Sequence, residues 1–378
     1  MNPTEFHRKI PLVWWAGLVT LVLLAILMVG LKPGDISPPN HAGWLGDRPG
    51  LRFQKIGIAY TDSISDLIRG HILPDRAFSM EIALQAKSFS EDGFQFILLV
   101  HGGRDDGQLL IGQWRSSLIV MNGDDYNHRR KTDRITVTSP AESPQPVFVT
   151  VTVGSGGTSV YLDGQAASVK KEMHLEMPED VNTRLLIGNS VYGKHHWEGE
   201  VYGVAVYGKT LSEEEVAVHH TGWSKNLDFS FAQGLAPVIL YSLDNGGSNR
   251  AAGHAGAAHA LQVPSRLKVL APSFFYQKLS FQRISRSLYK DRDALLNFFG
   301  FIPLGLALGA TLIKMGGRFE SRSIPIALAA GFLVSLWIET VQAWMPARSS
   351  DLQDLILNTA GTFVGALCCR YLLFRQKL

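Results

Sequence analysis

The sequence is poor in cysteine and has almost no net charge. Its 378 residues include two cysteines, Cys368 and Cys369, which are adjacent, so that bridging them would need a strained ring. No disulfide framework is therefore available. Lys and Arg number 36 against 33 Asp and Glu, a formal net charge of +3, which is too weak a bias to predict a nucleic-acid partner.

The sequence also lacks the common catalytic motifs. It contains none of the patterns Gly-x-Ser-x-Gly, His-Glu-x-x-His, Walker A or Gly-x-Gly-x-x-Gly. It thus supplies no recognisable nucleophile, metal site or nucleotide site. The residues favour a protein that is not an enzyme.

Long apolar runs, in contrast, are plentiful. Residues 10–31 carry no charge and follow Arg8 and Lys9, and about 20 apolar residues span a bilayer as a helix. A cleaved signal peptide is the alternative for this run, but no small-residue cleavage site of the A-x-A type follows it. Three more apolar runs predict a four-helix membrane protein: residues 294–313, 323–345 and 355–374.

The distribution of Lys and Arg predicts the orientation of these helices. The N-terminus, the loop after the second run and the C-terminus together hold eight, whereas the loop between the third and fourth runs holds one, Arg348. We therefore expect residues 1–9 and 375–378 to be cytoplasmic and the β-rich part of the chain to be extracytoplasmic. Five basic residues between Lys278 and Arg292 run against this assignment, but long translocated domains are largely exempt from the rule.

Between the first two apolar runs the pattern changes to short strands. Residues 51–235 contain segments that alternate with period two, and Asn122-Gly123 and Asp163-Gly164 are hairpin turn signals. Many strands at near-regular spacing predict an antiparallel β-sandwich. Residues 32–50 and 236–292 are interpreted as linkers.

The second linker has two distinctive parts. Residues 245–260 are rich in Gly and Ala, which indicates a flexible connection or a segment folded against the sandwich edge. Residues 273–290 place apolar and basic side chains on different sides of a helix, which fits an amphipathic helix on the membrane surface. A basic, solvated connector is the equal alternative for this part.

Three segments of the β-rich region resemble parts of a known fold. They are Tyr161–Gly164 (YLDG), Leu185–Ser190 (LLIGNS) and Trp197–Val216 (WEGEVYGVAVYGKTLSEEEV). Their order resembles the second half of a laminin-G/concanavalin A-like lectin jelly roll. The resemblance implies sugar or protein binding, often with calcium, and it makes the run Glu213–Glu215 a solvated turn.

Catalysis by this lectin-like domain is not expected. Jelly-roll glucanases place two carboxylates along one strand as Glu-x-Asp-x-Glu, and no such string occurs. His195, His196 and Trp197 are weak candidates for glycan binding, and for Trp197 core packing is the favoured interpretation. Adjacent histidines on a strand point to opposite faces, so no metal site is predicted. Calcium binding in this domain, through oxygens such as those of Asp163 and Asn189, is unsupported.

The last three apolar runs carry an unusual number of polar side chains. Ionisable and amide groups are costly in hydrocarbon, so their presence there is a functional hypothesis by default. The predicted topology brings eight of them to the outer leaflet: Asp293, Asn297, Glu339, Gln342, Arg348, Asp351, Asp354 and Asn358. Three pairs are spaced by three or four residues, so that each pair shares a helix face. They are Asp293 and Asn297, Glu339 and Gln342, and Asp354 and Asn358.

Residues 293–374 also resemble a known family. The matching residues are Asp293, residues 297–305 with Asn297, Pro303 and Gly305, and then Glu339, Gln342, Arg348, Asp351, Asp354, Asn358, Gly361 and Gly365. Together they look like the VanZ-like membrane family, whose members are associated with glycopeptide (teicoplanin) resistance and with envelope or exopolysaccharide contexts. The resemblance implies no settled reaction. The predicted fold is thus multidomain, a concanavalin A-like β-sandwich inserted into a four-helix transmembrane bundle.

Small residues and a short repeat bear on how these helices meet. Gly305-x-x-x-Gly309 and Gly361-x-x-x-Gly365 predict close helix approach. Asp293–Gly300 (DALLNFFG) and Asp354–Gly361 (DLILNTAG) share one pattern, and such a parallel repeat would suit a transporter or flippase.

Two interpretations of the polar residues stay open. In the structural one, Arg348 pairs with Glu339, Asp351 or Asp354, and Asn297 and Asn358 join helices. In the functional one, the same groups bind a lipid headgroup or a lipid-linked saccharide. Carboxylates outnumber Arg348, so a cationic or polyhydroxyl ligand fits better than an anion.

The expected function is that of a membrane-anchored envelope protein that binds an extracytoplasmic glycan and, through the VanZ-like bundle, a membrane lipid or lipid-linked saccharide. The alternative is a transferase or hydrolase of the outer leaflet with Glu339 or Asp354 as general base. The identity of the glycan and lipid and the oligomeric state do not follow from the sequence.

Overall fold

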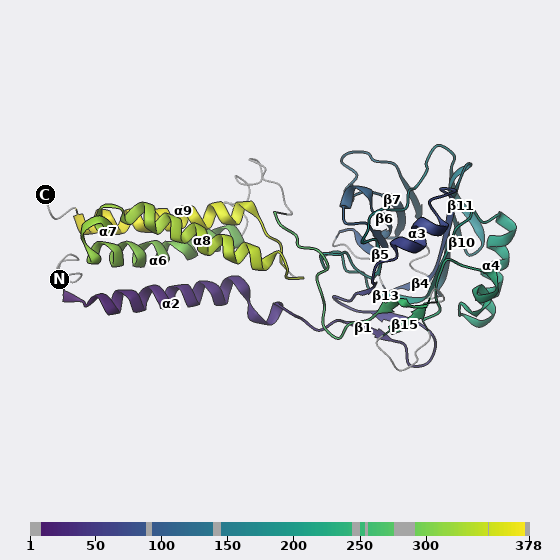
Figure 1. Ribbon diagram of the computed structural model, residues 1–378, viewed down its shortest axis with the longest axis horizontal. Helices are drawn as coiled ribbons and strands as arrows, with labels where there is room; N and C mark the ends of the chain where they lie inside the picture. The colour runs from purple at the N-terminus through teal and green to yellow at the C-terminus, as the bar shows by residue number, and fades with distance from the viewer. Residues whose placement is uncertain are drawn as a thin grey trace. The chain divides into compact units, whose positions relative to one another are not determined.

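The chain forms two compact units in a computed structural model (Figure 1). One unit comprises segments of Met1–Ser37 and Pro272–Leu378, and the other is Pro38–Ala271. The structure describes residues 9–87, 93–138, 145–243, 250–253, 256–275, 292–346 and 348–374. Most of the predicted surface helix, residues 276–291, and Arg8 lie outside the described residues.

Among its described residues, the first unit contains four long helices that run side by side (Figure 1). They are α2 (Leu12–Leu31), α6 (Arg292–Met315), α8 (Ser323–Gln342) and α9 (Leu352–Phe374). Short elements complete this unit: η1 (Pro33–Asp35) and α7 (Gly317–Ser321). All four long helices are long and apolar enough to cross a membrane, which confirms the predicted four-helix bundle.

Helices α6 and α9 pack with their backbones almost in contact. A methyl group at Gly305 would lie 2.1 Å from the carbonyl oxygen of Thr362, and one at Gly361 would lie 2.1 Å from that of Phe298. No side chain fits at either position, so glycine permits the crossing. The predicted close approach of these glycine pairs is present.

The second unit is an antiparallel β-sandwich. The first sheet contains β1 (Ala42–Trp44), β2 (Leu51–Phe53), β13 (Gly199–Tyr207), β4 (Phe78–Ala86), β9 (Val147–Gly154), β10 (Gly157–Leu162) and β11 (Gln165–Lys170) in spatial order, with β14 (Ile239–Tyr241) paired to β13. The second sheet contains β15 (Arg250–Gly253), β16 (Gly256–Gln262), β3 (Ala59–Thr61), β12 (Arg184–Ile187), β5 (Gln95–His101), β6 (Leu109–Trp114), β7 (Ser117–Asn122) and β8 (Arg134–Thr138). The main apolar core lies between the sheets.

The sandwich extends beyond residues 51–235. Strand β1 precedes this range, and β14 to β16 follow it, so part of the Gly/Ala-rich stretch forms a hairpin that pairs with β3. Residues 244–249 and 254–255 lie outside the described residues. The two ends of the unit are joined, because the N–H of Asn40 donates to Ser265 O at 3.1 Å and that of Leu267 to Pro38 O at 2.9 Å.

In the part of this unit that the structure describes, three short helices accompany the strands: α3 (Ser65–His71), η2 (Asp105–Gly107) and η3 (Ser230–Leu235). A longer helix, α4 (Glu213–Asn226), covers the outer face of the first sheet. The acidic run at its start is therefore helical, and its interpretation as a turn was wrong. Ser212 and Glu215 form a capping box, and carboxylates are favourable beside the positive end of a helix dipole.

The outer face of the second sheet carries a third apolar layer. Side chains of β5, β6, β7 and β12 meet residues from the loops around Tyr126 and Val191 and from the segment around Leu270. Leu270 N–H donates to Val191 O at 2.8 Å, which holds the last described residues of the sandwich against this face.

Candidate functional site

A carboxylate is buried at the C-terminal end of α8. Glu339 is 2% exposed, and its Oε2 accepts a hydrogen bond from the backbone N–H of Asp351 at 2.8 Å. Helix α8 turns Ser335, Glu339 and Gln342 inward because they share one face with Ala327 and Gly331. The carboxylate therefore faces the bundle interior and the chain that leads into α9.

An amide on α9 faces the same side of α8. Asn358 is 3% exposed and donates from Nδ2 to the Oγ of Ser335 at 2.9 Å, one turn before Glu339. Within the residues that the structure describes, the Oδ1 of Asn358 has no hydrogen-bond partner. Ser350, fully buried, faces the Glu339 carboxylate with its Oγ but forms no hydrogen bond of normal geometry. A buried polar atom without a partner is costly, so each needs an explanation.

Two further predicted residues hold this end of the bundle in place. Gln342 donates from Nε2 to Gly30 O of α2 at 2.8 Å. Asp351 accepts the N–H of Gln353 at 2.8 Å, as an N-terminal cap of α9 does. Asp354 is half-buried in the first turn of α9. Four of the eight predicted residues, Glu339, Gln342, Asp351 and Asn358, thus combine on α8 and the start of α9.

Two of the remaining predicted residues, Asn297 and Arg348, do not make the contacts that the structural interpretation predicted in the part of the chain that the structure describes. Asp293 is exposed in the first turn of α6. The half-buried Asn297 makes no hydrogen bond to another helix among the described residues, so its predicted bridging role was wrong. Arg348 forms no ion pair with Glu339, Asp351 or Asp354 in that part of the chain, and its backbone N–H donates to Met345 O at 3.2 Å. The ion pair of the structural interpretation is therefore not formed.

Ser335 and Ser350 were missed by the sequence analysis. Ser335 lies four residues before Glu339, so the helical spacing could have found it. Ser350 lies in a loop where no periodic signal exists, and only the folded chain shows that it is buried.

The sequence triplet proposed for glycan binding does not form one surface. Trp197 is fully buried and donates from Nε1 to Gln113 Oε1 at 2.7 Å. His195 stacks on Phe96 with ring centroids 4.5 Å apart, and its Nδ1 lies 3.0 Å from Phe94 O. Burial lowers the pKa of His195, which favours a neutral ring. His196 is half-buried.

A polar cluster lies near His195 on the outer face of the second sheet. The Oη of Tyr192 donates to the carboxylate of Asp105 at 3.0 Å, and His101 Nε2 lies 3.1 Å from Oδ1 of the same carboxylate. Gly103 N–H donates to His101 Nδ1, so His101 donates from Nε2. Burial lowers the pKa of the neighbouring Lys194 to about 8. This cluster combines fixed acceptors, an amine and aromatic rings.

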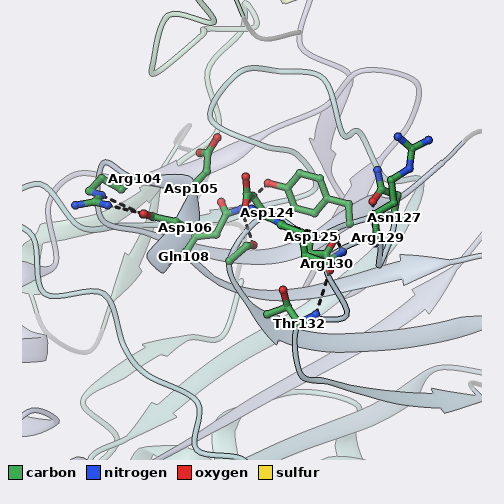
Figure 2. A network of polar contacts seen from close by, with 12 residues as sticks. Arg104, Asp105, Asp106, Gln108, Asp124, Asp125, Asn127, Arg129, Arg130 and Thr132 are labelled. Carbon is green, nitrogen blue, oxygen red and sulfur yellow. Dashed lines mark hydrogen bonds and ion pairs between the residues drawn. The ribbon is translucent and has the colours of Figure 1, made fainter. Parts of the chain in front are cut away.

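The adjoining loops are tied to each other (Figure 2). Gln108 donates from Nε2 to the Oη of Tyr126 at 2.5 Å and to Gly123 O at 3.1 Å. Asp125 is desolvated, but N–H groups of Arg130 and Thr132 donate to it at 3.1 Å and keep its pKa below the ordinary value. At the rim, Arg104 pairs with Asp106 and Arg130 with Asp124.

The described residues contain no group of three or more His, Cys, Asp or Glu placed to hold a metal ion. The two units define the class of this protein. It is a membrane protein in which an antiparallel β-sandwich is inserted between the first and second of four apolar helices.

Comparison with known families then specifies both parts. The sequence model of the VanZ/LLP1 family matches residues 235–375. That of the concanavalin A-like lectin/glucanases superfamily matches residues 65–217. The two matches confirm both resemblances seen in the sequence.

Two solved structures match part of the chain at low similarity. A Trypanosoma rangeli sialidase, in complex with 2,3-difluorosialic acid, is 15% identical with a TM-score of 0.38, over 50% of this chain and 29% of that one. The CBM40 of a Ruminococcus gnavus IT-sialidase, bound to alpha2,3 sialyllactose, is 13% identical with a TM-score of 0.36, over 45% and 96%. No curated protein matches the sequence. Function is therefore inferred from the two family matches and the site geometry.

Proposed function

We propose that this protein is an envelope protein of the cytoplasmic membrane that binds a glycan outside the cell and a lipid or lipid-linked saccharide at the outer leaflet. The observation that carries the proposal is the buried carboxylate of Glu339, one turn of α8 from the serine that Asn358 contacts, together with the Asn358 Oδ1, which has no partner among the described residues. Glycopeptide resistance and exopolysaccharide assembly are the contexts that the VanZ-like part suggests.

The contacts of this site favour binding over a purely structural role. A polar network that only holds helices together gains most when every member has its partner. Here Arg348 is not paired with the neighbouring carboxylates in the described chain, and Asn358 uses only its donor side. Polar groups kept in a membrane helix with unmet hydrogen-bonding capacity are typical of ligand sites.

For the sandwich, we place the glycan near Asp105, Tyr126 and Tyr192. Their polar atoms are positioned beforehand by His101 and Gln108, and half-buried rings can stack on sugar faces. Trp197 is excluded from this role because its ring has no exposed face. His195 and His196 would act at the margin of the site.

Native mass spectrometry of the detergent-purified full chain tests the bundle half of the proposal. We expect a retained lipid or lipid-linked sugar in the wild type that is lost in both Glu339→Gln and Asp354→Asn. Glu320→Gln makes the same chemical change in α7 and is expected to keep the ligand. Retention by all variants, or no retained species in the folded wild type, would contradict binding at this cluster.

The same preparation addresses the enzymatic alternative. Conversion of the retained species into a smaller product during incubation would instead support a transferase or hydrolase.

A glycan array probed with the full chain tests the sandwich half of the proposal. We expect Tyr126→Ala and Tyr192→Ala to lose the binding signal, whereas Val181→Ala, at an exposed position elsewhere, should keep it.

A further inference from the structure

The side chains around Glu339 need donors more than acceptors. The Asp351 N–H supplies one hydrogen bond to Glu339, and Asn358 spends its own donor on Ser335. The Oδ1 of Asn358 can only accept, and it is buried without a partner among the described residues. The Oγ of Ser350 can also accept. The ligand that completes this site therefore carries several N–H or O–H groups.

The charges of the site specify that donor further. Glu339 and Asp351 are carboxylates, and the nearest described cation in sequence, Arg348, is half-buried and pairs with neither. A carboxylate removed from water is costly unless a cation compensates it. A positively charged donor thus fits better than a neutral hydroxyl.

We propose that this site binds the primary ammonium of a phosphoethanolamine-type headgroup, with Arg348 binding the attached phosphate. The inference rests on the proposed lipid-binding function and names the headgroup. An ammonium offers three N–H donors, which suits the Glu339 carboxylate, the Ser350 Oγ that faces it, and the Asn358 Oδ1 near Ser335, one turn of α8 away. Arg348, two residues from Ser350, offers the planar donor pair that binds phosphate in two places at once.

The comparison of amine with methylated amine isolates this contact. Phosphatidylethanolamine and phosphatidylcholine share charge and phosphate, but the trimethylated nitrogen has no N–H. We would measure the binding of each, and of phosphatidylglycerol, to the delipidated full chain in detergent by native mass spectrometry. The wild type is expected to prefer the ethanolamine lipid over the choline lipid by roughly tenfold, the effect of one lost charged hydrogen bond.

Variants assign the preference to named side chains. Glu339→Gln and Asn358→Leu should reduce the preference to less than about threefold, whereas Glu320→Gln should leave it at roughly tenfold. Arg348→Gln should weaken both lipids and preserve the ratio between them. The melting temperature in lipid-free detergent checks folding, and Ser350→Ala replaces any variant that fails to fold.

The outcomes separate this inference from the broader proposal. Equal binding of the ethanolamine and choline lipids, or stronger binding of phosphatidylglycerol, overturns the ammonium assignment. If a lipid-linked saccharide is still retained at the cluster, the proposed function stands without the ammonium assignment. If no lipid of any class binds, both the proposed lipid binding and the ammonium assignment fail. Soluble O-phosphoethanolamine that displaces the lipid at equal concentration would point to a free amine as the natural ligand and overturn the lipid source.

Discussion

Glu81 and Glu339 are both removed from solvent, but their surroundings differ. Glu81, in β4, is fully buried, with His219 Nδ1 at 2.9 Å from one oxygen and the Tyr207 Oη donating to the other at 3.1 Å. Glu339 receives one backbone N–H from Asp351. The first carboxylate is completed by two side chains of the protein itself, whereas the second has one backbone donor among the described residues.

The Glu81 contacts predict a large effect of one histidine. His219→Ala would leave the buried carboxylate with a single donor, and breaking such a pair costs about 3 kcal/mol or more. We expect the melting temperature of the sandwich to fall by roughly 5 to 10 °C in a fluorescence-monitored melt.

His220→Ala is the matched control for this prediction. The ring of His220 is partly exposed and 4.0 Å from Asp163, so its removal should shift the melting temperature little. Equal shifts of the melting temperature in the two variants would contradict a specific stabilising contact between His219 and Glu81.

Residue-level features divide by whether their partners are close in sequence. Glu339, Gln342 and Asn358 were predicted because charges and amides are conspicuous in apolar runs. Glu81 and His219 are 138 positions apart, and nothing in a β-strand and an amphipathic segment indicates that they meet. The burial of Trp197 agrees with the predicted core packing, whereas the separation of Asn297 from the network depends on long-range packing.

At the scale of elements, α6 and α9 depend on their glycines. A methyl group at Gly361 would lie 2.1 Å from Phe298 O and would force the helices apart. We expect Gly361→Ala to destabilise the bundle by about 2 kcal/mol, as overpacking does, and to lower its melting temperature in detergent.

Gly300, on α6, provides the comparison. Nothing lies within 4 Å of a methyl group placed there, so Gly300→Ala should be neutral or slightly stabilising through helix propensity. A lower melting temperature in both variants would mean that alanine destabilises the bundle for reasons unrelated to the contact between α6 and α9.

Local patterns predicted most elements. Apolar length gave the four long helices, and alternation with turn signals gave the sandwich strands. The helical start at Ser212 was also readable as Ser-x-x-Glu, but the family resemblance led to a turn instead. The hairpin of β15 and β16 was harder to predict, since Gly and Ala have low strand propensity and its pairing with β3 spans most of the sandwich.

At the scale of the whole molecule, the orientation in the membrane is still a prediction. Lys and Arg beside the short loops place both termini in the cytoplasm. A green fluorescent protein fused after Leu378 should fluoresce, and alkaline phosphatase at the same position should be inactive. Alkaline phosphatase fused after Phe275 in a shortened chain should be active. The reverse pattern would invert the topology and place the sandwich in the cytoplasm.

The joined ends of the sandwich have a consequence for how such a chain can arise. Pro39 and Arg266 form a bridge between the first and last segments of this unit, so its entry and exit lie next to each other. Domains with neighbouring ends can be inserted into, or removed from, a host loop without stretching it. Residues 38–271 can therefore be removed as one unit. We expect the four-helix bundle to assemble alone in a chain that carries a short Gly/Ser turn in their place.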